Sequence, residues 1–300
     1  MRKIRLPIIL LVCVLVCHSC NTCSRSQRIS DITVDLADFA IDSTYADMAM
    51  KVFYALPTPI EMSILIKNSG IAWNVDLLSD PADASKFLTH KKMALNFGIY
   101  VTDLTYAGLF QQSQTALRYK LALQKLIEGL GLQSSINVNT MRLLEENIND
   151  KDMLLRVISD TYSSCSASLN ESDRYSLTLT ILAGGWVEGM YISTGTLNEN
   201  LLQNEDKIKQ LVIDQILTFD MMWHVMSELR NIPDIDNLLS EFSGLAQLFD
   251  QIGIFQTENI VNDIADISEI ASSNIINVTP EDFQKIKVQI QILRNSFTKI

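Results

Sequence analysis

The chain has 300 residues, with 24 Lys and Arg against 35 Asp and Glu, and a formal net charge of −11. A surface this acidic repels phosphate backbones, and no run of basic residues in the sequence reverses the charge locally, so we predict no nucleic-acid partner. With five cysteines in 300 residues, four of them within the first 23, the sequence also excludes a disulfide framework.

The N-terminal segment has the three parts of a secretory signal. A basic stub precedes an apolar run at 6–16, which is too short to span a bilayer, and the small residue Ser19 precedes Cys20. This arrangement resembles the bacterial lipobox, which implies that Cys20 becomes the first mature residue and carries lipid. We therefore predict a signal peptide at 1–19, cleaved before Cys20. Cleavage before Cys17 or Cys23, or ordinary secretion, stays open.

Cleavage before Cys20 would remove three basic residues and no acidic ones, which makes the remainder still more acidic. Residues 20–43 are polar and are predicted to form a lipid-anchored tether, followed by a single all-helical domain at 44–300. The tether carries Arg25 and Arg28 but no acidic cluster. By resemblance to Bacteroidota export signals, this favours the outer membrane, facing the periplasm, over the cell surface.

Helical periodicity predominates after the tether, and strand signals are scarce, so we predict an all-α globular bundle of about ten helices without a significant sheet. Capping residues and prolines at 58–61, 80–83 and 279–282 indicate helix starts. The capping pattern also explains Glu61 without a functional role. The expected helices are 44–55, 59–69, 83–110, 112–130, 139–148, 150–168, 172–195, 205–230, 234–250, 257–272 and 280–297.

Three segments have an unusual composition. They read LPTPIE at 56–61, NFGIYVTDLTYA at 96–107 and GGWVEGMYI at 184–192. Together they resemble a group of uncharacterised lipoproteins of Bacteroidota with similar LPxPxE, GIYxxDLxYA and GGWxEGxYI segments. The resemblance implies a family that spans most of the mature chain, but it implies no activity and no functional residue.

The second and third segments each place an acid three residues before a tyrosine in an apolar helix. Asp103 shares a helix face with Tyr106, and Glu188 shares one with Tyr191, so both acids are predicted to point inward. Buried carboxylates need partners, and the Trp186 indole N–H and the tyrosine hydroxyls are candidates. These residues form either a structural polar core or the lining of a ligand pocket.

A third acid, Asp220, lies among apolar residues one turn before His224, and we add both to the candidate polar core. Their spacing puts both side chains on one helix face, as a metal site would require. Di-iron bundles need a second Glu/His helix, and none is present. We therefore predict no metal and no cofactor.

The sequence contains no signature of nucleophilic, phosphate-binding or zinc-dependent catalysis. The first hypothesis is therefore a lipid-anchored, non-enzymatic binding or assembly component, held to the membrane by its anchor and able to take a protein partner. The second is a small-molecule binding protein with a core pocket around Asp103 and Glu188. The third is a hydrolase that uses the buried carboxylates.

Overall fold

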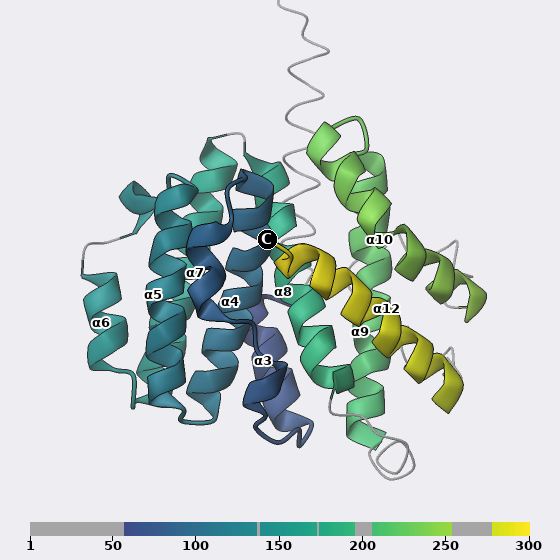
Figure 1. Ribbon diagram of the computed structural model, residues 1–300, viewed down its shortest axis with the longest axis horizontal. Coiled ribbons are helices and arrows are strands. Elements are labelled where there is room, and N and C mark those ends of the chain that lie inside the picture. The colour runs from purple at the N-terminus through teal and green to yellow at the C-terminus, as the bar shows by residue number, and fades with distance from the viewer. Residues whose placement is uncertain (1–56, 137–138, 173, 196–205, 254–277) are drawn as a thin grey trace, which may run out of the picture. The chain divides into compact units, whose positions relative to one another are not determined.

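A computed structural model describes residues 57–136, 139–172, 174–195, 206–253 and 278–300 (Figure 1). By its contacts the chain divides into two units, Met1–Ser43 and Thr44–Ile300, and every described residue belongs to the second unit. These residues form α-helices and short 3-10 helices and no strand, so the predicted all-α class is confirmed. The predicted signal peptide, Cys20, the tether and the expected helices at 44–55 and 257–272 lie outside the described residues.

The helices follow the expected order along the chain. The α-helices are α3 (Pro59–Asn68), α4 (His90–Leu109), α5 (Ser113–Gly129), α6 (Thr140–Glu146), α7 (Lys151–Glu171), α8 (Tyr175–Gly195), α9 (Asp206–Glu228), α10 (Pro233–Gln251) and α12 (Pro280–Thr298). The 3-10 helices are η2 (Val75–Leu77), η3 (Pro81–Lys86) and η4 (Gln133–Ser135). None of the helices in these residues combines the length and apolar character that a membrane crossing requires.

The first and the last α-helix of the described residues each begin with a capping box. Thr58 accepts a hydrogen bond from the backbone N–H of Glu61, whose carboxylate accepts one from the N–H of Thr58. Thr279 and Asp282 repeat this arrangement at the start of α12. These local bonds satisfy N–H groups that have no partner inside the helix, so they fix where α3 and α12 begin.

The expected single helix at 83–110 is wrong. The chain forms η3 from Pro81, runs in an extended conformation through Phe87, and begins α4 after Thr89, whose hydroxyl accepts from the N–H of Lys92. Phe87 is buried while Leu88 is 84% exposed, so the interruption turns the chain to place one apolar side chain in the core.

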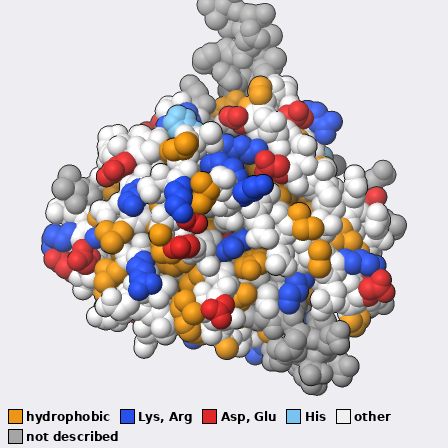
Figure 2. Space-filling view, viewed as in Figure 1, with side chains coloured by type: hydrophobic (Ala, Val, Ile, Leu, Met, Phe, Trp, Pro, Cys, Tyr) orange, Lys and Arg blue, Asp and Glu red, His pale blue; other side chains and the backbone are white. Residues whose placement is uncertain are grey.

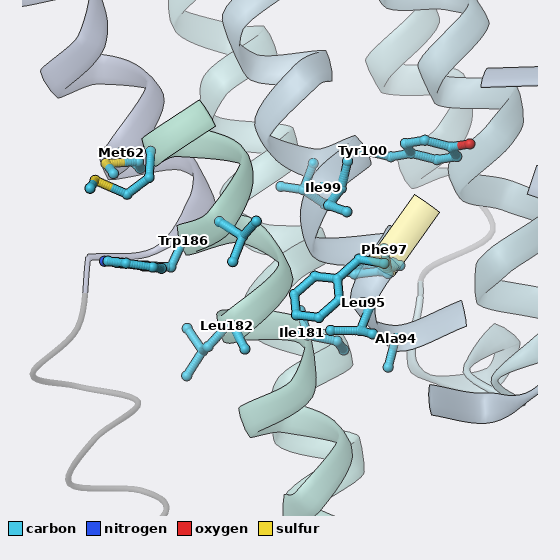
Figure 3. Packing of buried hydrophobic residues seen from close by; sticks show 14 of the residues in the cluster. Met62, Ala94, Leu95, Phe97, Ile99, Tyr100, Ile181, Leu182 and Trp186 are labelled. Carbon is cyan, nitrogen blue, oxygen red and sulfur yellow. The ribbon is translucent and has the colours of Figure 1, made fainter. Parts of the chain in front are cut away.

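The most extensive helix pair is α4 with α8. Their backbones approach so closely that a Cβ atom built on Gly98 would overlap the carbonyl oxygen of Ile181, and one on Gly184 would overlap that of Leu95. Figure 3 shows Leu95, Phe97 and Ile181 packed around this crossing. The glycines at 98 and 184 therefore serve close helix packing, which brings Asp103 and Glu188 toward each other.

Aromatic side chains join α8 to the helices that follow it. The ring of Trp186 lies 5.2 Å from Phe219 of α9, and Phe242 of α10 lies 5.6 Å from Phe219 and 5.8 Å from Phe297 of α12, all between ring centroids. These rings are fully or almost fully buried. They hold α12 along α8, which is where Arg294 of α12 meets the buried Glu188.

Candidate functional site

Glu188 of α8 and Arg294 of α12 form a two-pronged ion pair. The Nε of Arg294 donates to Oε2 of Glu188 at 3.0 Å, and its Nη2 donates to Oε1 at 3.1 Å. The Glu188 side chain is fully buried and that of Arg294 is 11% exposed. Paired donors from a guanidinium match the two oxygens of a carboxylate, so this pair fixes the orientation of both side chains.

Ser79, in the segment between η2 and η3, connects the ion pair to Asp103. Its hydroxyl accepts from Nη2 of Arg294 at 2.6 Å, and its backbone N–H donates to Oδ2 of Asp103 at 3.2 Å. Its carbonyl oxygen accepts from the Tyr119 hydroxyl of α5. One residue of an irregular segment thus links α4, α5 and α12.

Asp103 is fully buried on α4, as its position on the helix face predicted. No donor is directed at its Oδ1, whereas Oδ2 accepts from Ser79. Burial and the neighbouring Glu188 carboxylate raise the pKa of Asp103 well above its ordinary value, against the opposing effect of Arg294. We call Asp103, Glu188 and Arg294 the buried ionic cluster.

Two tyrosines lie beside this cluster as neutral hydrogen-bond donors. Tyr100 donates to the carbonyl oxygen of Asp80 at 2.8 Å, and its ring packs edge-on against Tyr119, with centroids 5.6 Å apart. Burial, assisted by the neighbouring Asp103, raises the pKa of both phenols above the ordinary value. Neither phenol loses its proton at neutral pH, so their role is to hold the segment around Ser79 and Asp80.

Of the other predicted candidates, Tyr191 lies at the buried ionic cluster, whereas Tyr106 and Trp186 bond elsewhere. The Arg294 guanidinium lies 4.5 Å from the centroid of the Tyr191 ring. The Tyr106 hydroxyl donates to the Ala72 carbonyl oxygen at 2.7 Å, and the Trp186 indole donates to that of Gln215 at 3.3 Å. Both side chains donate to backbone carbonyl oxygens, so Trp186, one of the candidate partners of the buried acids, donates elsewhere.

Asp220 and His224 lie on α9 and take no part in the hydrogen bonds of the cluster. Asp220 is half-buried, and burial raises its pKa while His224 lowers it. His224 is exposed. Within the described residues, no three His, Cys, Asp or Glu side chains lie together in a way that could hold a metal ion.

Sequence reasoning missed Arg294, Ser79 and Tyr119. Arg294 had a signal, because it lies four residues after Ile290 and next to Leu293, both on the buried face of an amphipathic helix. A basic residue there, in a chain with buried acids, indicates a partner for one of them. Ser79 had no such signal, since its part depends on how an irregular segment folds.

The C-terminal end of α12 is held by a second basic residue. Nζ of Lys92, in α4, donates to the carbonyl oxygens of Ser296 and Lys299 at 2.6 and 3.0 Å. Nδ2 of Asn96 donates to that of Phe297 at 3.1 Å. Figure 2 shows Lys and Arg side chains gathered on the face where the chain ends, although the whole chain is acidic.

Two cavities lie away from the buried ionic cluster. An apolar cavity of about 20 Å³ is enclosed by α4, α5, α6 and α7, next to Phe97 and Tyr162. An open depression of about 530 Å³ lies between α10 and α12 and is lined by glutamines, including Gln247 and Gln284. Neither Asp103 nor Glu188 lines these two spaces.

The fold and the site define an all-α protein whose core contains an ion-paired acid cluster. No known protein family, curated protein or solved structure matches the chain. The site is therefore interpreted from its own geometry.

Proposed function

We propose that the protein is a lipid-anchored component of the bacterial cell envelope that acts by binding or assembly and not by catalysis. The observation that supports a non-catalytic role is the ion pair of Glu188 and Arg294. Both carboxylate oxygens accept hydrogen bonds from the protein's own guanidinium, so the acid that a pocket or an active site would use already has its partner. The cluster then serves to fix α12 on α8.

The two other hypotheses require more than this geometry offers. A small-molecule pocket around Asp103 and Glu188 requires Arg294 to swing away from Glu188. A hydrolase requires two carboxylates that reach substrate and water across an open cleft, whereas both carboxylates are fully buried. Both hypotheses therefore depend on an opening of α12, and the binding role does not.

The anchor at Cys20 and the periplasmic face of the outer membrane belong to the same proposal and rest on the sequence. Each buried methylene of an attached acyl chain adds about 0.8 kcal/mol of membrane affinity, so a multiply acylated cysteine needs no second anchor. The partner of the helical domain would be another envelope protein. The buried ionic cluster faces inward, so that partner would bind other surfaces of the domain.

Labelling with a fatty-acid analogue, followed by membrane fractionation, tests the anchor. Wild type and Cys23→Ser are expected to be labelled and to stay in the membrane fraction, because Cys23 is not the acylated residue. Cys20→Ser is expected to lose the label and to accumulate as unprocessed precursor or soluble protein. Unchanged labelling of Cys20→Ser would contradict the proposal and direct attention to Cys17 or Cys23.

A search for catalysis tests the rest of the proposal. The purified full-length protein, offered model glycosides and esters, is expected to be inactive, and Glu188→Gln to be indistinguishable from it. Hydrolysis by the wild type that disappears in Glu188→Gln, with the fold retained by circular dichroism, would establish the hydrolase hypothesis instead.

A further inference from the structure

The buried ionic cluster contains one acid more than it has bases. Asp103 and Glu188 are both fully buried, and Arg294 is the cation that acts on both of them. If both carboxyls were ionised, one negative charge would remain without a counter-charge in a region of low dielectric constant. Such a charge is costly enough that a buried acid normally keeps its proton instead.

The hydrogen bonds show which acid keeps it. Arg294 donates to both oxygens of Glu188, which fits an ionised carboxylate. Asp103 accepts from the N–H of Ser79 at Oδ2, while Oδ1 receives no donor. A buried carboxyl oxygen without a donor fits a protonated acid better than an ionised one, so the arrangement assigns the proton to Asp103.

Among the residues that the structure describes, the other groups that face Asp103 do not supply a second positive charge. Tyr119 of α5 and Tyr100 of α4 are neutral phenols, and the further groups that act on Tyr100, Asp83 and Asp80, are acids. On α3, which also packs against α4, Glu61 caps its own helix.

Basic side chains near these helices are engaged elsewhere. Lys67 of α3 lies over the Phe110 ring. Lys287 of α12 donates to the Gly195 carbonyl oxygen at 3.4 Å. Lys92 of α4 donates to the end of α12. The excess charge is therefore balanced by a proton.

We propose that Asp103 is a protonated carboxylic acid at neutral pH and that its proton couples the docking of α12 on α8 to pH. Loss of the proton leaves two buried carboxylates beside one guanidinium, and only water can relieve the excess charge. Among the three cluster side chains Arg294 alone has exposed surface, so water reaches the cluster along α12. Raising the pH therefore loosens α12 first.

The direction of the effect follows from linkage. The pKa of Asp103 is raised in the folded protein, so the folded state holds a proton that the unfolded state releases above about pH 4. The resulting stabilisation is complete below the unfolded pKa and is lost as the pH rises through the folded pKa. In that window the unfolding equilibrium constant increases by up to about tenfold per pH unit.

The decisive comparison uses Asp103→Asn, because asparagine has the shape of the protonated acid. Its oxygen can accept from the backbone N–H of Ser79, and the amide carries no charge at any pH. Asp250→Asn, at an exposed position on α10, is the matched control. Urea unfolding of the full-length protein from about pH 5 to about pH 9 is expected to show falling stability in wild type and in Asp250→Asn. Asp103→Asn is expected to lose the part of this fall in stability that comes from the proton on Asp103.

Two further measurements test the proposal without relying on a two-state unfolding curve. Infrared spectra at neutral pH are expected to contain the carbonyl band of a protonated carboxylic acid, absent only in Asp103→Asn. Hydrogen exchange, normalised to the unstructured rate, is expected to show that protection of α12 falls with pH in wild type and stays constant in Asp103→Asn. If the infrared band is missing in wild type, or if Asp103→Asn keeps the full pH dependence, the proposal is wrong.

Discussion

Gly98 of α4 faces the backbone carbonyl of Ile181 in α8 with no room for a side chain between them. This contact sets the distance between the helices that carry Asp103 and Glu188. It also leads to the first prediction.

Gly98→Ala is expected to destabilise the protein strongly, because the new methyl group meets backbone, which cannot rotate away. Overpacking of a buried site costs about 1–3 kcal/mol and exceeds that when backbone must shift. The gain in helix propensity, about 1 kcal/mol, is too small to compensate. Urea unfolding measures the difference.

Gly244→Ala is the matched control on α10. Gly244 is an exposed helical glycine, and its Cβ would meet only Oε1 of Gln289, at 3.4 Å. It is expected to stabilise the protein by up to about 1 kcal/mol. Equal effects of the two substitutions would show that α4 and α8 are not in close backbone contact.

Lys92→Met is expected to free the end of α12. It keeps the apolar stem but removes the ammonium that donates to three carbonyl oxygens at and just after the end of the helix. The Lys92 ammonium is partly withdrawn from solvent. This burial lowers the pKa of Lys92, and the nearby Glu241 carboxylate opposes the shift. The expected loss is about 1–2 kcal/mol, with faster hydrogen exchange confined to the end of α12.

Lys91→Met provides the comparison for Lys92, because Lys91 makes a partly exposed ion pair with Glu241 at 2.7 Å. Such pairs contribute about 0–1 kcal/mol. If Lys91→Met loosens α12 as much as Lys92→Met does, the bonds to the last turn are not what holds the helix end.

The features that the sequence could predict are those formed by residues close together in the chain. The capping boxes at Thr58 and Thr279 involve residues three apart, and the inward direction of Asp103 and Glu188 follows from helix periodicity. The pair of Glu188 with Arg294 joins residues 106 positions apart, so helix periodicity can place Arg294 on a buried face but cannot show which acid it binds. The break before Thr89 was missed because the proline at 81 resembled the start of a long helix, although it begins only a 3-10 helix.

Cys165 is expected to react with alkylating reagents only when the protein unfolds. It is buried in α7, and burial raises the pKa of its thiol to about 12, so the thiolate is nearly absent at neutral pH. In a variant with serine at positions 13, 17, 20 and 23, Cys165 is the one remaining thiol, and its labelling rate with and without urea is expected to follow the unfolded fraction. Rapid labelling of the folded protein would show that α7 does not cover this side chain.

The last prediction concerns the pair of Glu188 and Arg294 and separates a scaffold from a pocket. Glu188→Ala leaves the guanidinium buried without its carboxylate and is expected to cost about 3–5 kcal/mol, the range for a broken buried ion pair. Glu188→Gln keeps one acceptor oxygen and is expected to be milder.

The double variant of Glu188→Ala with Arg294→Met tests whether these costs come from the pair itself. Methionine removes the charge and keeps part of the apolar volume, so no unpaired guanidinium remains. The double variant is therefore expected to be more stable than the sum of the single losses implies, with a coupling of about 1–3 kcal/mol from the urea unfolding free energies. A pocket open to water would solvate Glu188 in the empty protein, and Glu188→Ala would then change stability by less than about 1 kcal/mol with no coupling to Arg294. That result would remove the scaffold interpretation and, with it, the main support for a non-catalytic role.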